Sequence, residues 1–126
     1  MKYKYILLID DDEDDQVIFM SGIRAVSKTA VCRCMFSAKE ALEGLEKGEI
    51  TPEVIFLDLN MPLMNGQQFL VEIKKRESLK KIPIIIFSTS SNKRTVDTLL
   101  ELGADNFITK PGRYEDLVSI LKESII

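Results

Sequence analysis

The most concentrated chemistry in this sequence is a run of acidic side chains. Residues 10 to 15 read Asp-Asp-Asp-Glu-Asp-Asp, six consecutive carboxylates directly after the apolar run Tyr5 to Ile9. Two carboxylates 4 Å apart repel by about 1 kcal/mol in water and by about 4 kcal/mol in a partly buried site. The run therefore requires a solvated surface, a helix N-terminus or a bound cation.

Other polar side chains stand at the ends of other apolar runs. If those runs are neighbouring strands about 4.8 Å apart, the residues at their ends form one row. The row would hold an acid pair, an acid, a hydroxyl and an ammonium. Such a row suits a hard cation, for which Mg2+ is the natural choice, on one side of the single acid and an oxyanion on the other. The residues in question are Asp10, Asp11, Asp58, Ser88 and Lys110.

The acidic run is thereby divided between two roles. Asp10 and Asp11 are interpreted as cation ligands, whereas Glu13, Asp14 and Asp15 favour the positive N-terminus of the helix that follows. An EF-hand loop is excluded, because its sixth position would be Asp15 instead of glycine and its twelfth would be Ser21 instead of glutamate.

The elements that must position these residues form a repeating strand and helix pattern. Short apolar runs alternate with segments of helical period, and three of the runs are continuously apolar, as strands buried on both faces are. The pattern predicts a doubly wound α/β domain with a five-stranded parallel sheet in the order 2-1-3-4-5, whose ligands bind at the carboxyl ends of the strands. The predicted strands are Tyr5 to Ile9, Ala30 to Phe36, Val54 to Leu57, Ile84 to Phe87 and Asn106 to Thr109.

The helices between the strands have recognisable ends. Ser37 and Glu40 have the spacing of a capping box, and Gly48 can end that helix in the left-handed conformation. A further helix is expected after Gly66. Another should follow Ser90-Ser91 and end at Gly103, and the last should begin near Arg113. Their predicted buried faces are Phe69, Leu70 and Ile73; Val96, Leu99 and Leu100; and Tyr114, Leu117, Val118, Leu121 and Ile125.

Composition limits the class of protein. The 126 residues have the size of one domain, and a net charge of -3 with a pI near 5.1 argues against direct nucleic-acid binding. The apolar runs are too short for a signal peptide or for the about 20 residues of a membrane span, so we expect a cytoplasmic protein. Cys32 and Cys34 are expected to be buried or half-buried free thiols.

The motifs at the predicted strand ends, taken together and in order, resemble the receiver domain of two-component response regulators. The resemblance covers essentially all 126 residues. It rests on "LLIDD" (7 to 11), "VIFLDLNMPLMNG" (54 to 66), "IIIFSTS" (84 to 90) and "GADNFITKPG" (103 to 112). It implies a flavodoxin-like (βα)5 fold and a single receiver domain over residues 1 to 126.

The resemblance also implies a role for each site residue. Asp58 resembles the phosphoacceptor, which takes a phosphoryl group from a phosphohistidine of a histidine kinase or histidine phosphotransfer protein. Asp11 would bind Mg2+ directly, Asp10 largely through water, and the backbone carbonyl of Asn60 would complete the protein ligands. Lys110 would pair with one phosphoryl oxygen, which supplies the charge neutralisation that phosphoryl transfer needs. Ser88 would form a hydrogen bond with another phosphoryl oxygen.

Switching in that family implies a coupled pair. Ser88 would move toward the phosphoryl group and Phe107 would fill the vacated space, repacking the face of the fourth helix, fifth strand and fifth helix. The output would reach a downstream protein, from a monomer or a weak phosphorylation-dependent dimer that is not a turnover enzyme. By the same resemblance Lys110-Pro111 is expected to be cis, and Gly66 is expected to allow a positive φ in the loop that begins at Met61.

Two other functions share parts of this pattern. A Mg2+-dependent phosphatase of the haloacid dehalogenase type works through aspartyl phosphate, but it needs a second acid where Asp58-Leu59-Asn60 has an amide. A flavodoxin-like electron carrier needs a phosphate loop after the first strand, where six carboxylates would repel the phosphate of FMN. The phosphatase is retained as the alternative.

Overall fold

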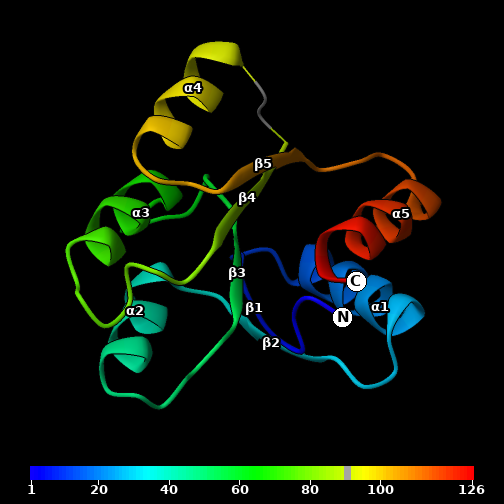
Figure 1. Ribbon diagram of the computed structural model, residues 1–126. Coiled ribbons are helices and arrows are strands. Elements are labelled where there is room, and N and C mark those ends of the chain that lie inside the picture. The colour runs from blue at the N-terminus through cyan, green and yellow to red at the C-terminus, as the bar shows by residue number, and fades with distance from the viewer. Residues whose placement is uncertain (90–91) are drawn as a thin grey trace.

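The computed structural model describes residues 1–89 and 92–126, within which five strands alternate with five helices (Figure 1). The order along the chain agrees with the strand and helix pattern predicted from the sequence. The elements are β1 (Tyr5–Ile9), α1 (Glu13–Val26), β2 (Val31–Met35), α2 (Ala38–Glu46), β3 (Val54–Leu57), α3 (Gly66–Lys74), β4 (Ile84–Ser88), α4 (Lys93–Glu101), β5 (Asn106–Thr109) and α5 (Tyr114–Ile125).

The five strands form one parallel sheet in the order β2-β1-β3-β4-β5, as the sequence predicted. Helices α1 and α5 cover one face, and α2, α3 and α4 cover the other (Figure 1). The last residue of β1, Ile9, pairs with Leu57 at the end of β3, and Ser88 at the end of β4 pairs with Thr109. The residues that follow these strands therefore emerge along one edge of the sheet.

The three central strands are buried on both faces, which confirms the reading of their continuous apolar runs. Every residue of β3 and β4 is buried, as is every residue of β1 after Tyr5. Under α1, Phe19 packs edge to face on Phe56 and Phe87, with ring centroids 5.0 and 5.5 Å apart. Fully burying one such side chain contributes about 1.5 to 3 kcal/mol, so these strands are rigid supports for whatever follows them.

The ends of α2 form much as expected. Ser37 Oγ accepts a hydrogen bond from the backbone N–H of Glu40 at 3.2 Å, which is one arm of the predicted capping box. Gly48 follows the helix with φ of 73°, a left-handed conformation that glycine adopts without steric cost. A complete capping box, which the sequence analysis missed, begins α3, where Asn65 and Gln68 exchange both hydrogen bonds.

The predicted buried faces of α4 and α5 each contain one exposed residue, and their valines Val96 and Val118 are half-buried. Leu99 is fully buried, but Leu100 is 42% exposed because the next residue of a helix points about 100° away. Tyr114 is also exposed, and its hydroxyl pairs with Ser21 Oγ of α1 at 2.9 Å instead of entering the core. The pair Ser90-Ser91 that this helix was predicted to follow lies outside the described residues, and Asn92 caps the helix.

Cys32 and Cys34 are free and half-buried on β2, as predicted. Within the described part of the chain, no helix is both long and apolar enough to span a bilayer.

Candidate functional site

The backbone fixes two carboxylates at the sheet edge. Asp10 follows β1 and its N–H donates to Met35 O at 3.0 Å, while the N–H of Asp58, directly after β3, donates to Ile9 O at 3.0 Å. These bonds extend the parallel ladders by one residue, so both side chains leave the sheet from defined positions. Asp10 is 1% exposed and Asp58 is 6% exposed.

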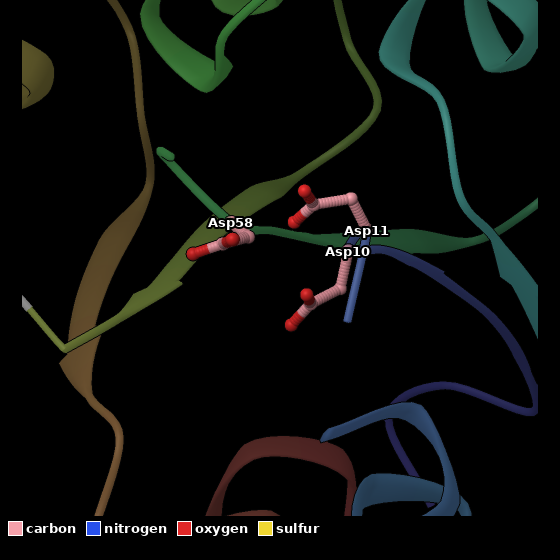
Figure 2. A group of neighbouring side chains, drawn as sticks. All are labelled: Asp10, Asp11 and Asp58. Atoms are coloured by element: carbon pink, nitrogen blue, oxygen red, sulfur yellow. The ribbon is translucent and has the colours of Figure 1, made fainter. Parts of the chain in front are cut away.

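Asp11 completes a cluster of three carboxylates. One carboxylate oxygen from each of Asp10, Asp11 and Asp58 lies within 4.8 Å of the others. Figure 2 shows Asp10 and Asp11 leaving the end of β1 in different directions, with Asp58 beside them at the end of β3. Oxygen ligands of this kind are what Mg2+ binds in proteins, and few are needed because the ion keeps several waters. The donor set fits a hard divalent cation.

Burial makes two of these carboxylates, Asp10 and Asp58, weaker acids. It raises the pKa of Asp58 to about 6, and the attraction of Lys110 offsets the rise only in part. Burial also raises the pKa of Asp10, against hydrogen bonds from Lys110 and from the N–H of Asp12. One ammonium cannot neutralise the whole cluster, so the site keeps an excess of negative charge that a cation would relieve.

Lys110 lies against the same cluster from the end of β5. Its ammonium is 2.9 Å from Asp10 Oδ2 and 3.6 Å from Asp58 Oδ1, and the side chain is 12% exposed. Burial alone would lower the pKa of Lys110, but hydrogen bonds to Asp10 and Asp15 raise it well above its usual range. Lys110 is therefore a permanent positive charge beside Asp58.

The other predicted site residues occupy the same edge or the layer beneath it. Ser88, the last residue of β4, is fully buried. Phe107 on β5 is half-buried, pairs in register with Ile86 and packs against the core on the α2–α4 side of the sheet. Asn60 is exposed, two residues past Asp58.

Two polar contacts of the site were missed by the sequence analysis. Asp15 Oδ2 accepts a hydrogen bond from Lys110 Nζ at 2.8 Å, although Asp15 also lies in the first turn of α1 as predicted. The buried Gln16 donates from Nε2 to the backbone carbonyl of Asp10 at 2.7 Å. An amide within an acidic helix start was the one available signal for Gln16, and no local pattern joins Asp15 to a lysine 95 residues away.

The loop after β3 corrects the expectation for Gly66. The positive φ in this loop belongs to Leu63, at 68°, and not to Gly66. Glycine is required at residue 66 for a different reason: a Cβ there would overlap the carbonyl oxygen of Asp58 and lie 2.9 Å from Leu59 Cα. Gly66 therefore allows the start of α3 to pack in direct contact with the backbone of Asp58 and Leu59.

The expected cis bond before Pro111 was also wrong. No peptide bond among the described residues is cis, so Lys110-Pro111 is trans, the commoner form for bonds before proline. Lys110 reaches the carboxylates nonetheless, because its N–H donates to Ser88 O at 2.8 Å and fixes the backbone from which the side chain extends.

Comparison with known proteins gives consistent matches. The family described as the response regulator receiver domain matches residues 6–122. Response regulator Rcp1 of Synechocystis is 29% identical over 94% of this chain and 84% of Rcp1. The two-component response regulator ORR11 of Oryza sativa is 34% identical over 90% of this chain and 75% of ORR11.

Longer relatives contain the matching segment as a part. The chain spans 15% of the sensor histidine kinase CheAY of Helicobacter pylori, which is 32% identical. It spans 32% and 29% of two protein-glutamate methylesterases, from Methanococcoides burtonii and Treponema denticola.

Solved structures agree with the fold. The phosphorylated cyanobacterial phytochrome response regulator RcpA superposes with a TM-score of 0.88 at 28% identity, covering 97% of this chain and 91% of RcpA. The Mn2+-bound form of Rcp1 superposes with a TM-score of 0.83 at 29% identity, covering 95% of this chain and 90% of Rcp1. This chain belongs to the response regulator receiver domain family.

Proposed function

We propose that residues 1–126 form one receiver domain that works as a phosphoacceptor switch in two-component signalling. The observation that supports this best is the position of Asp58, whose carboxylate lies within 4.8 Å of those of Asp10 and Asp11 and 3.6 Å from the ammonium of Lys110. A nucleophile close to both a cation site and a fixed positive charge suits the transfer of an anionic phosphoryl group.

The reaction assigned to this geometry is an in-line displacement. A carboxylate oxygen of Asp58 attacks the phosphorus of a phosphohistidine, the P–N bond breaks as the new P–O bond forms, and the imidazole leaves. Asp58 must be ionised to attack, and its raised pKa of about 6 leaves it mostly ionised at neutral pH. Lys110 neutralises charge on the phosphoryl oxygens.

We assign Asp11, Asp10, Asp58 and the backbone carbonyl of Asn60 as ligands of Mg2+, with Asp10 acting largely through water. When bound, the ion would offset the mutual repulsion of the carboxylates and the charge of the phosphoryl group. The Mn2+-bound form of the relative Rcp1 supports a divalent cation for this chain as well.

Ser88 and Phe107 are proposed to carry the signal outward. Ser88 would donate to a phosphoryl oxygen on Asp58, and Phe107 would repack against the core as Ser88 moves. The face of α4, β5 and α5 would change with it and bind a downstream protein. The phosphoryl donor would be a histidine kinase or a histidine phosphotransfer protein, and the chain would act in the cytoplasm as a monomer or a weak phosphorylation-dependent dimer.

The phosphatase alternative lacks one catalytic group. Asn60 stands where such an enzyme needs its second acid, and it is an exposed amide. We therefore propose a protein that promotes its own phosphorylation and dephosphorylation without turning over external substrates.

The experiment is phosphorylation by acetyl phosphate with and without Mg2+, followed by mass spectrometry of the intact protein. The wild type should gain one phosphoryl group, and only when Mg2+ is present. Asp58→Asn should gain none. The matched control is Asp14→Asn, which removes an exposed carboxylate of α1 and should be phosphorylated like the wild type. Phosphorylation of Asp58→Asn, or turnover of many phosphomonoesters, would contradict the proposal.

A further inference from the structure

The hydrogen bonds of the Lys110 ammonium go to two carboxylates other than Asp58. Its Nζ is 2.9 Å from Asp10 Oδ2 and 2.8 Å from Asp15 Oδ2, both within normal hydrogen-bond range. Asp58 Oδ1 is 3.6 Å away, close enough for an ion pair but beyond that range. Asp10 and Asp15 thus determine where the ammonium stands.

These two acceptors differ in their relation to the cation site. Asp10 belongs to the carboxylate cluster and is 1% exposed, whereas the Asp15 side chain is 38% exposed and lies outside that cluster. A cation bound by the cluster, whose water would donate to Asp10, would compete with Lys110 for the electron pairs of Asp10. Of the two hydrogen-bond acceptors described here, Asp15 is the one that the cation leaves available.

Lys110 needs such a partner because its side chain is long and has room to move. A lysine side chain has about 2 kcal/mol of rotamer entropy to lose when it is fixed. A hollow of about 90 Å3 is lined in part by Lys110 and by Phe87, whose ring centroid is 5.8 Å from Lys110 Nζ. The hollow is lined by residues that include Asp15, Ile18, Phe19, Phe87, Lys110 and Pro111.

We propose that Asp15 is a positioning residue that holds the ammonium of Lys110 in place for the phosphoryl group on Asp58 while the cation is bound. The proposal rests on the function proposed above and adds a residue to it. Asp15 is outside the carboxylate cluster and would act through Lys110 instead of contacting the phosphorus or the cation. Its carboxylate comes from the first turn of α1, so this helix start forms one wall of the site.

The test is beryllofluoride binding, as a mimic of the phosphoryl group, by isothermal titration calorimetry at saturating Mg2+. Asp15→Asn should bind beryllofluoride at least about fivefold more weakly than the wild type, since the acceptor for Lys110 changes from a charged carboxylate to a neutral amide oxygen, which forms a weaker hydrogen bond. Asp14→Asn is the matched control, because it removes the same charge from the same helix turn at an exposed residue, and its affinity should stay within about twofold. General electrostatics predicts the opposite sign, because removing a carboxylate favours anion binding.

Two further measurements separate positioning from a structural role. Mg2+ affinity should stay within about twofold in Asp15→Asn, and the 15N-detected ammonium signal of Lys110, observable when its protons are protected, should be lost in Asp15→Asn and kept in Asp14→Asn. Asp15→Glu, which restores the charge, should recover most of the beryllofluoride affinity.

The outcomes distinguish this proposal from the function on which it rests. Wild-type binding together with equal affinity in Asp15→Asn and Asp14→Asn would overturn the role of Asp15 and leave the phosphoacceptor function standing. Failure of the wild type to bind beryllofluoride would overturn both.

Discussion

The ammonium of Lys110 lies 3.6 Å from the carboxylate of Asp58, across 52 residues of chain from the end of one parallel strand to the end of another. Neither side chain has a reason to be buried alone, since burial of an unpaired charge is costly. Their proximity makes the pKa of Asp58 depend on the charge of Lys110, and this dependence can be measured.

Replacing Lys110 with methionine keeps the length of the side chain and removes its charge. Because Lys110 lowers the pKa of Asp58 against the larger effect of burial, the pKa of Asp58 in Lys110→Met should rise further, by about one pH unit or more above 6. Carboxyl 13C NMR titration in EDTA measures this directly. Phosphorylation by acetyl phosphate should also slow at least about tenfold. Lys93→Met, at the exposed start of α4, is the control, and an unchanged Asp58 titration in Lys110→Met would contradict the assignment.

The raised pKa of Asp58 predicts a pH-dependent gain in stability for Asp58→Asn without metal. The pKa of Asp58 is about 3.9 in the unfolded chain and about 6 in the folded protein, so folding favours the protonated form. The stabilisation from that proton is complete below the unfolded pKa and is lost as pH rises through the folded one. Relative to the wild type, Asp58→Asn should therefore gain up to about 3 kcal/mol between pH 4 and pH 7.

Urea unfolding in EDTA across that range measures the difference in the free energy of unfolding. Asp14→Asn should give a difference that stays flat with pH, because its carboxylate is exposed. A flat difference for Asp58→Asn as well would show that burial of Asp58 does not carry the predicted energetic cost.

The close approach of Gly66 to the Asp58 backbone predicts a large cost for the smallest possible side chain. Gly66→Ala would place a Cβ 2.9 Å from Leu59 Cα and against the Asp58 carbonyl, with backbone on both sides that cannot yield cheaply. We expect about 1 to 3 kcal/mol of destabilisation. The control is Gly112→Ala, where a Cβ meets nothing within 4 Å and which should change stability by less than about 0.5 kcal/mol. Equal stabilities of the two variants, measured by urea unfolding, would refute this reading of Gly66.

The left-handed conformation of Leu63 predicts a substitution that stabilises the protein. Leu63 has a φ of 68° and is 94% exposed, so it incurs backbone strain without gaining burial. Leu63→Gly should raise the free energy of unfolding by about 1 kcal/mol, because glycine adopts this conformation freely. Leu63→Ala keeps a Cβ and should give no such gain. Thermal or urea unfolding of the two variants measures the change in stability. An equal gain in Leu63→Ala and Leu63→Gly would rule out relief of backbone strain as the cause.

Much of this protein follows from local sequence pattern. Continuous apolar runs such as Val54–Leu57 could be assigned to buried parallel strands because a strand between two helical layers has no solvated face. Once the strands were placed, the topology rule for ligands located Asp10, Asp11, Asp58, Ser88 and Lys110 at one edge. The residue types at the strand ends were sufficient to predict that these groups meet, because backbone hydrogen bonds fix the distance between neighbouring strands.

What the sequence left open depends on contacts between distant segments. Three contacts depend on how α1 and α5 lie on the sheet: the Lys110–Asp15 hydrogen bond, the Gln16–Asp10 hydrogen bond and the Tyr114–Ser21 hydrogen bond. The sequence pattern does not give the rotation of these helices about their axes or their distance from the sheet. The sequence also did not predict the conformation of the loop after β3, because a glycine such as Gly66 is compatible with either a positive φ or a close backbone contact. Local chemistry determined which groups meet at the site, and packing of the helices decided their partners.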